Sequence, residues 1–230
     1  MLASYPTEYQ DRFGKETTII ENDGKTLQMI VRGVEFSGGS FDSLDPPDTV
    51  GKPAPESFSF FLGSLCACKI RCDVPIWVVD NTNTIQSTLR IHLDLGEFNE
   101  SRGALSREIL RLELMYGDKT FSSTGENLYS SFDEQLTELE ALLPKNLHLK
   151  ICWTCAFSDY HWSGSGAFGN LACFRNTKEQ YLRARTRDDL RALWNERTED
   201  IQEIYLCPEY ERRQPGSGLY IGEEYPGKRG

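Results

Sequence analysis

The stretch Leu89-Arg90-Ile91-His92-Leu93-Asp94-Leu95 alternates strictly between aliphatic and polar side chains. A period of two places the aliphatic side chains on one face of a β-strand and the polar side chains on the other. One face of this strand is therefore predicted to be buried while the other meets water. Such strands are typical of antiparallel sheets.

The same period extends along the chain on both sides of this strand. The segments 16–21 and 26–32 flank Asn22-Asp23-Gly24-Lys25, and Asp-Gly between two apolar runs predicts a tight hairpin. Short strands at regular intervals, without helical pattern between them, favour an antiparallel β-sandwich. Further strands are predicted at 57–62, 65–79, 87–95, 107–115 and 120–123.

A helical period replaces the strand period near residue 131. Apolar residues recur at helical spacing as far as position 143, and Ser131 with Glu134 matches a capping box. Pro144 ends the run. We therefore expect one helix over residues 131–143 that covers the sheet.

Charge divides the chain into unequal parts. The 230 residues carry a net charge of −10, and 23 of the 35 Asp+Glu but only 14 of the 25 Lys+Arg lie within residues 1–150. We interpret the protein as a β-rich α+β fold in three parts. These are an acidic β-sandwich-like domain over 1–146, a small cysteine-liganded α/β module over 147–213 and a flexible tail over 214–230.

Composition also excludes several classes of protein. A strongly acidic chain lacks the concentrated basic surface that general nucleic-acid binding needs. No apolar stretch approaches the ~20 residues of a membrane span, and the first residues do not resemble an export signal. We therefore expect a cytoplasmic protein with no membrane contact.

The seven cysteines fall into two groups by spacing. Cys66, Cys68 and Cys72 share one face of a predicted strand, where free thiols serve as small buried hydrophobes. Cys152 and Cys155 form a C-x2-C pair at the end of a strand, a common knuckle for zinc. The four cysteines of the second group predict a closed site for structural Zn²⁺: Cys152, Cys155, Cys173 and Cys207.

Other interpretations of the C-x2-C pair are weaker. A thioredoxin-like redox pair needs a helix to start at the motif, and a zinc deaminase needs an H-x-E element that this chain lacks. A cysteine nucleophile paired with His148 or His161 remains open, as does replacement of a cysteine ligand by His161. We also predict a polar pocket near the metal, formed by Asp159, Tyr160, His161 and Arg175.

Two further patterns have both a functional and a plain structural interpretation. Gly164–Gly169 matches G-x-G-x-x-G, but no strand and helix of a parallel sheet flank it, which favours a simple turn. The arginines at 183, 185, 187 and 191 form a cluster that suits an anionic partner, although neighbouring acidic residues also fit a solvated face.

Four short motifs together resemble a family of bacterial proteins of unknown function. The resemblance implies a bacterial source and a single unit that spans both parts of the chain, and it assigns no reaction. The residues that carry it are Cys152-Trp153-Thr154-Cys155, Ser158-Asp159-Tyr160, the segment 166–175 with Phe168-Gly169 and Cys173-Phe174-Arg175, and Leu206-Cys207-Pro208-Glu209.

These observations predict a non-catalytic binding or adaptor protein with structural zinc, whose partner is another protein. A metal-dependent or thiol-dependent enzyme of unknown reaction is the main alternative. An immunity or phage-defence accessory protein, whose acidic surface covers a basic partner, is a further one.

Overall fold

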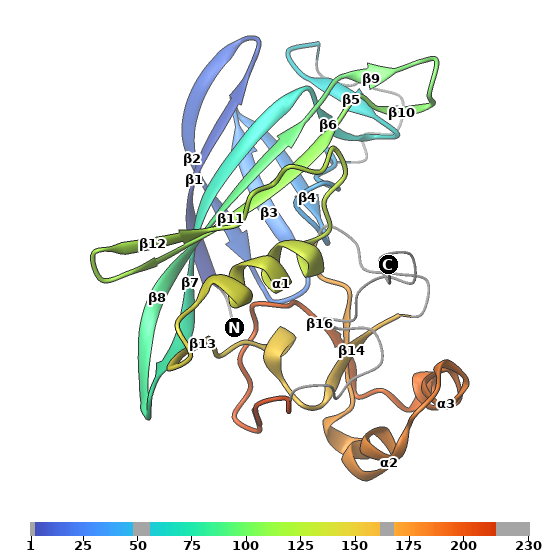
Figure 1. Ribbon diagram of the computed structural model, residues 1–230. Coiled ribbons are helices and arrows are strands. Elements are labelled where there is room, and N and C mark those ends of the chain that lie inside the picture. The colour runs from blue at the N-terminus through green and yellow to red at the C-terminus, as the bar shows by residue number, and fades with distance from the viewer. Residues whose placement is uncertain (1–2, 48–55, 162–167, 215–230) are drawn as a thin grey trace.

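The computed structural model describes residues 3–47, 56–161 and 168–214, and its main feature is a large antiparallel sheet (Figure 1). The sheet has nine strands in the order β12-β11-β8-β7-β1-β2-β3-β4, with β13 paired to β7. Its strands are β1 (Ala3–Asp11), β2 (Gly14–Asn22), β3 (Leu27–Val31), β4 (Val34–Gly38), β7 (Cys68–Asp80), β8 (Asn83–Leu95), β11 (Glu108–Tyr116), β12 (Lys119–Ser122) and β13 (Leu147–Leu149).

Smaller elements surround this sheet. Two short hairpins lie at one end of it and a three-stranded sheet belongs to the C-terminal part, which also carries two short helices (Figure 1). These elements are β5 (Ser59–Phe61), β6 (Ser64–Cys66), β9 (Phe98–Asn99), β10 (Ala104–Leu105), β14 (Ser158–Tyr160), β15 (Leu171–Cys173), β16 (Glu199–Ile201), α1 (Phe132–Leu142), α2 (Lys178–Arg183) and α3 (Arg187–Leu193).

The predicted alternation is confirmed in β8. Leu89, Ile91, Leu93 and Leu95 are buried while the residues between them are partly exposed. The predicted hairpin is confirmed as well, because β2 pairs with β3 around Asp23-Gly24. The segment 65–79 is interrupted at Ala67, whose φ of 51° separates β6 from β7. Cys66, Cys68 and Cys72 are all buried, as expected.

The β-rich antiparallel character is confirmed, but the sandwich needs a correction. Within the described residues the long strands form one continuous sheet rather than two sheets packed face to face. The inner face of this sheet packs on α1 and on the C-terminal part (Figure 1), whose side chains occupy the place of a second sheet. The strand β1, which the sequence pattern did not predict, joins β2, β3 and β4 to the other long strands, because it pairs with both β2 and β7.

The predicted helix is confirmed as α1, with Ser131 as its N-cap. The Ser131 hydroxyl accepts from the Glu134 N–H at 3.2 Å, and the Ser131 N–H donates to the Glu134 carboxylate at 3.3 Å, which completes the capping box. Phe132, Leu136 and Leu139 are fully buried against the sheet. Thr186 and Asp189 form a second capping box at α3, whereas the Thr177 side chain does not cap α2.

One hydrophobic core crosses the predicted boundary at residue 146. It contains the inner face of the sheet, α1 and buried C-terminal side chains such as Trp153, Tyr160 and Phe168. A small second cluster, built on Phe174, Tyr181 and Leu190, lies beneath α2 and α3. The C-terminal part therefore contributes to the same core as the sheet.

Among the described residues, no helix is both long enough and apolar enough to cross a membrane. The predicted flexible tail lies outside the described residues apart from Gln214. So does most of the Gly164–Gly169 segment.

Candidate functional site

The four predicted metal ligands come from three separate segments of the C-terminal part. Cys152 opens a short 3-10 helix, Cys155 follows that helix, Cys173 ends β15 and Cys207 lies in the irregular chain after β16. All four are free thiols and are at most 7% exposed. These four cysteines, which span 56 positions of the sequence, are therefore all shielded from solvent.

Main-chain hydrogen bonds bring these segments together. The Cys152 N–H donates to the Tyr205 carbonyl at 2.6 Å, and the Arg213 N–H donates to the Thr154 carbonyl at 2.9 Å. The segment 203–213 therefore runs alongside the C-x2-C motif. The Cys155 N–H donates to the Cys152 carbonyl at 3.0 Å, which closes the turn between the two thiols.

Burial raises the pKa of both Cys152 and Cys173, and the neighbouring thiols raise each further. Cys155 and Cys207 contribute to both shifts, so these two thiols lie close to Cys152 and to Cys173. Backbone groups act in the opposite direction. The Cys207 N–H donates to the Cys152 sulfur and the Arg175 N–H donates to the Cys173 sulfur, which favours thiolate.

The donor set suits zinc, but the side chains are not arranged around a single point. Among the described residues, no three His, Cys, Asp or Glu side chains are positioned to hold a metal ion as they stand. Four thiolates with N–H groups directed at sulfur are nevertheless the chemistry of a closed Zn²⁺ site. Coordination would require the four side chains to turn toward a common centre.

The residues of the predicted polar pocket make separate contacts in the structure. Asp159 and Tyr160 are buried on β14, where the Tyr181 hydroxyl donates to Asp159 at 2.9 Å. Arg175 instead forms an ion pair with Glu199, with 2.6 Å between Nη1 and Oε1. His161 packs edge-on against Trp194, with ring centroids 4.9 Å apart. A pocket shared by the four side chains stays a prediction.

Sequence reasoning missed two further buried carboxylates, Glu203 and Asp133. Glu203 is fully buried and accepts from the Gly169 N–H at 2.7 Å and the Tyr160 hydroxyl at 3.2 Å. Asp133 accepts from the Trp153 indole N–H at 2.6 Å. Burial raises the pKa of Tyr160, and Glu203 and Asp133 raise it further.

This buried network fastens the C-terminal part to the rest of the molecule. Asp133 belongs to α1 and Trp153 to the C-x2-C motif, so their hydrogen bond joins the two. Nearby, the amides of Asn22 and Gln202 exchange hydrogen bonds of 2.7 and 3.0 Å between β2 and the segment after β16. Every one of these polar groups is hydrogen-bonded, which is the usual condition for burying them.

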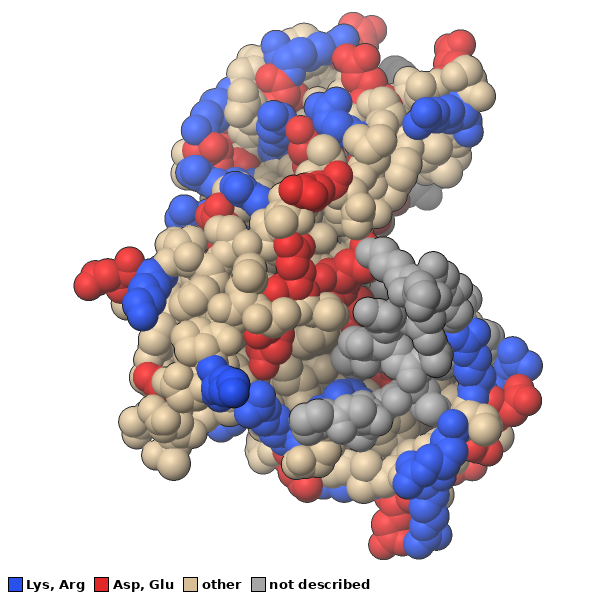
Figure 2. All heavy atoms as spheres, in the orientation of Figure 1, with Lys and Arg blue, Asp and Glu red and all other residues tan. Residues whose placement is uncertain are grey.

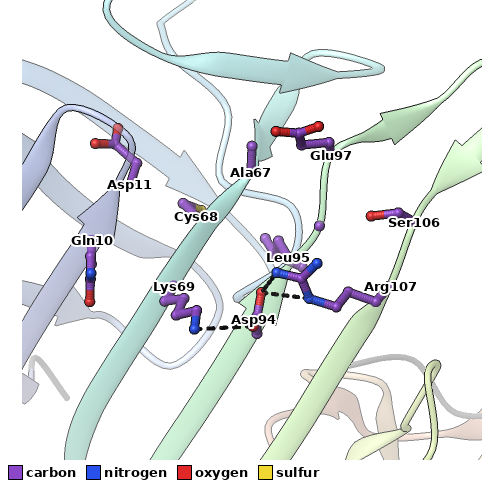
Figure 3. Close-up of a pocket in the computed structure, with 11 residues that line it drawn as sticks. Gln10, Asp11, Ala67, Cys68, Lys69, Asp94, Leu95, Glu97, Ser106 and Arg107 are labelled. Atoms are coloured by element: carbon purple, nitrogen blue, oxygen red, sulfur yellow. Dashed lines mark hydrogen bonds and ion pairs between the residues drawn. The ribbon is translucent and has the colours of Figure 1, made fainter.

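A hollow of about 250 Å³ lies at one end of the sheet (Figure 3). Lys69 and Arg107 both bind Asp94 across it, at 3.5 and 2.8 Å, so each of these three charged groups already has a partner. Cys68 also lines the hollow, and burial raises the pKa of its thiol to about 12. A thiol in this state is protonated at neutral pH and is a poor nucleophile.

The arginine cluster of α2 and α3 is interspersed with acidic side chains. Arg183 pairs with Glu179 at 3.2 Å and Arg191 with Asp188 at 3.6 Å. Figure 2 shows blue and red side chains together over these helices. The cluster therefore presents mixed charge rather than a purely cationic surface.

Comparison with protein families gave a match over most of the chain. Residues 3–158, which cover the sheet, α1 and the C-x2-C motif, match the family of unknown function DUF6304. The chain belongs to this family. The DUF6304 match crosses the boundary at residue 146 just as the core does, and it confirms the expected membership of a family without assigned activity. Searches among curated proteins and solved structures gave no match.

Proposed function

We propose that this DUF6304 protein is a non-catalytic binding protein whose C-terminal part is stabilised by one structural Zn²⁺ ion. The observation that carries the proposal is that Cys152, Cys155, Cys173 and Cys207 are all buried on segments that main-chain hydrogen bonds hold side by side. Free thiols packed together gain little from one another, whereas a shared cation stabilises their thiolate forms.

Zinc would connect segments that have little regular structure of their own. Cys152 and Cys155 would supply the first pair of ligands, with Cys173 from β15 and Cys207 from the chain after β16 completing a tetrahedron. Four cysteine ligands leave no coordination position for water or substrate, which is why such sites are structural. Folding of the C-terminal part and zinc binding would then be coupled.

Binding is favoured over catalysis because the ionisable groups that line the hollows of the sheet already pair with one another. Carboxylates such as Asp94 and Glu8 already form ion pairs there, with Lys69 and Arg71. The net charge of −10 disfavours nucleic acid, so another protein is the proposed partner. The buried free cysteines suit a reducing, cytoplasmic setting.

Metal analysis tests the zinc site directly. The full chain, purified without chelator, should contain one zinc per molecule by inductively coupled plasma mass spectrometry. Cys152→Ser and Cys207→Ser should each lose most of this zinc and lower the melting temperature, because three thiolates hold the ion less tightly. Cys66→Ser serves as the matched control, since Cys66 is also buried but lies on β6.

The design separates a metal site from ordinary core packing. If thiols merely fill space, Cys66→Ser and Cys152→Ser should destabilise the protein without any change in metal content. Wild-type protein with far less than one zinc per chain, or ligand variants with undiminished zinc, would refute the proposal.

A further inference from the structure

The outer face of the large sheet carries two regions of opposite character. We define the outer face as the side away from α1, where the side chains between the core positions of each strand lie. Its cationic half spans β7, β8 and the start of β11, and its apolar-acidic half spans β2, β3 and β4. Both halves belong to one continuous surface because β1 joins them.

The cationic half holds more positive than negative side chains. Five Lys and Arg residues meet four carboxylates there, namely Asp73, Asp94, Glu113 and Glu8 of the adjoining β1, which leaves a surplus of one positive charge in a chain whose net charge is −10. Arg90 binds Asp73 at 2.7 Å and Arg111 binds Glu113 at 3.0 Å, so the carboxylates hold the cations in place. The five cations are Lys69, Arg71, Arg90, Arg107 and Arg111.

The apolar-acidic half exposes two isoleucines between two glutamates. Ile19 on β2 and Ile30 on β3 are 51% and 58% exposed, and they line a hollow of about 620 Å³. Glu21 and Glu35 line the same hollow. Exposed aliphatic side chains that stand together on a rigid sheet are a common mark of an interface.

The two halves of this face are complementary in charge. We propose that the outer face is an interface with a second copy of this chain, related by a two-fold axis that places each cationic half against the apolar-acidic half of its partner. In such an isologous contact the same patch is used twice, so one surface must contain both complementary regions. An acidic partner protein would match the cationic half but would meet like charge at Glu21 and Glu35.

The available surface is large enough for a stable contact. The seven strands of the two halves and β1, spaced about 4.8 Å apart over about 20 Å of their length, give a face of roughly 670 Å² per copy. A standard protein interface buries about 800 Å² per partner. Two sheets packed in this way would form a sandwich between molecules. The proposal does not depend on zinc.

Charge reversal tests the interface by mixing. Wild-type protein should sediment as a dimer in analytical ultracentrifugation and dissociate as salt is raised. Arg71→Glu/Arg111→Glu and Glu21→Lys/Glu35→Lys should each be monomeric, because one half of the face then repels its counterpart. An equimolar mixture of the two variants should recover the dimer mass, since both contacts become complementary again.

Controls keep this result separate from folding. Circular dichroism and the melting temperature should show that both variants fold. Arg183→Glu/Lys145→Glu makes the same change in charge at exposed positions away from the outer face and should remain dimeric. A monomeric wild-type protein at the highest soluble concentration, a dimer unaffected by both reversals, or a mixture that stays monomeric would each overturn the proposal.

Discussion

At the scale of single residues, Glu108 has an unusual environment for a carboxylate. It lies at the start of β11 on the side of the core, and burial, followed by the charge of Asp42, raises its pKa to about 7. The unfolded chain titrates near 4.5 at this residue. Between these values the folded protein holds more protons than the unfolded one, so stability falls as pH rises through this window.

Glu108→Gln should remove this pH dependence. Between pH 5 and pH 8 the difference in the free energy of unfolding between the variant and wild type should grow by about 2 kcal/mol in favour of the variant. The reason is that the folded variant does not have to hold a buried charge at the higher pH. Urea denaturation at a series of pH values measures the difference. The exposed Glu126→Gln serves as control, and equal pH profiles for wild type and Glu108→Gln would contradict the prediction.

At the scale of elements, α1 depends on its N-cap. Ser131→Ala removes the hydroxyl that accepts from the Glu134 N–H and should cost about 1 kcal/mol of stability. Chemical denaturation measures this cost. Thr137→Ala changes an exposed position in the middle of the same helix and should be neutral or slightly stabilising. A similar loss of stability in both variants would contradict the prediction that the Ser131 hydroxyl stabilises the helix.

Elements with strong local signals were predictable and those without were not. The aliphatic alternation of β8 and the capping box of α1 specify their structure locally. β1 gives a weaker signal, because its buried positions are Tyr5, Thr7 and Tyr9 and it contains Pro6. The proline is tolerated because pairing with β7 begins only at Thr7.

The candidate site shows the same limit. The spacing of Cys152 and Cys155 indicated a zinc knuckle, and the two cysteines lie at the ends of a 3-10 turn, while their binding of zinc stays a prediction. Glu203 gave no local signal, because its donors come from Gly169, Asn170 and Tyr160 through the tertiary fold. The ion pair of Arg175 with Glu199 gave no local signal either, because the two residues are 24 positions apart along the chain.

At the scale of the whole molecule, the sheet and the C-terminal part share one core. A chain that ends at residue 146 would expose the inner face of β3, β7 and β8, which packs against Trp153, Tyr160 and Phe168 in the intact protein. We expect this truncated chain to aggregate or to lack a native-like heteronuclear NMR spectrum. The full chain should unfold in one calorimetric transition. A truncated chain that unfolds cooperatively on its own would contradict this prediction.

The hydrogen bonds between Asn22 and Gln202 also have a consequence during synthesis. These residues are 180 positions apart, and translation proceeds at about 5–20 residues per second, so Asn22 is synthesised roughly 9–36 s before its partner. Throughout this time the inner face of β2 and β3 has no C-terminal cover. The nascent chain therefore passes through a long interval in which chaperone capture competes with aggregation, and the rate of elongation influences the yield of native protein.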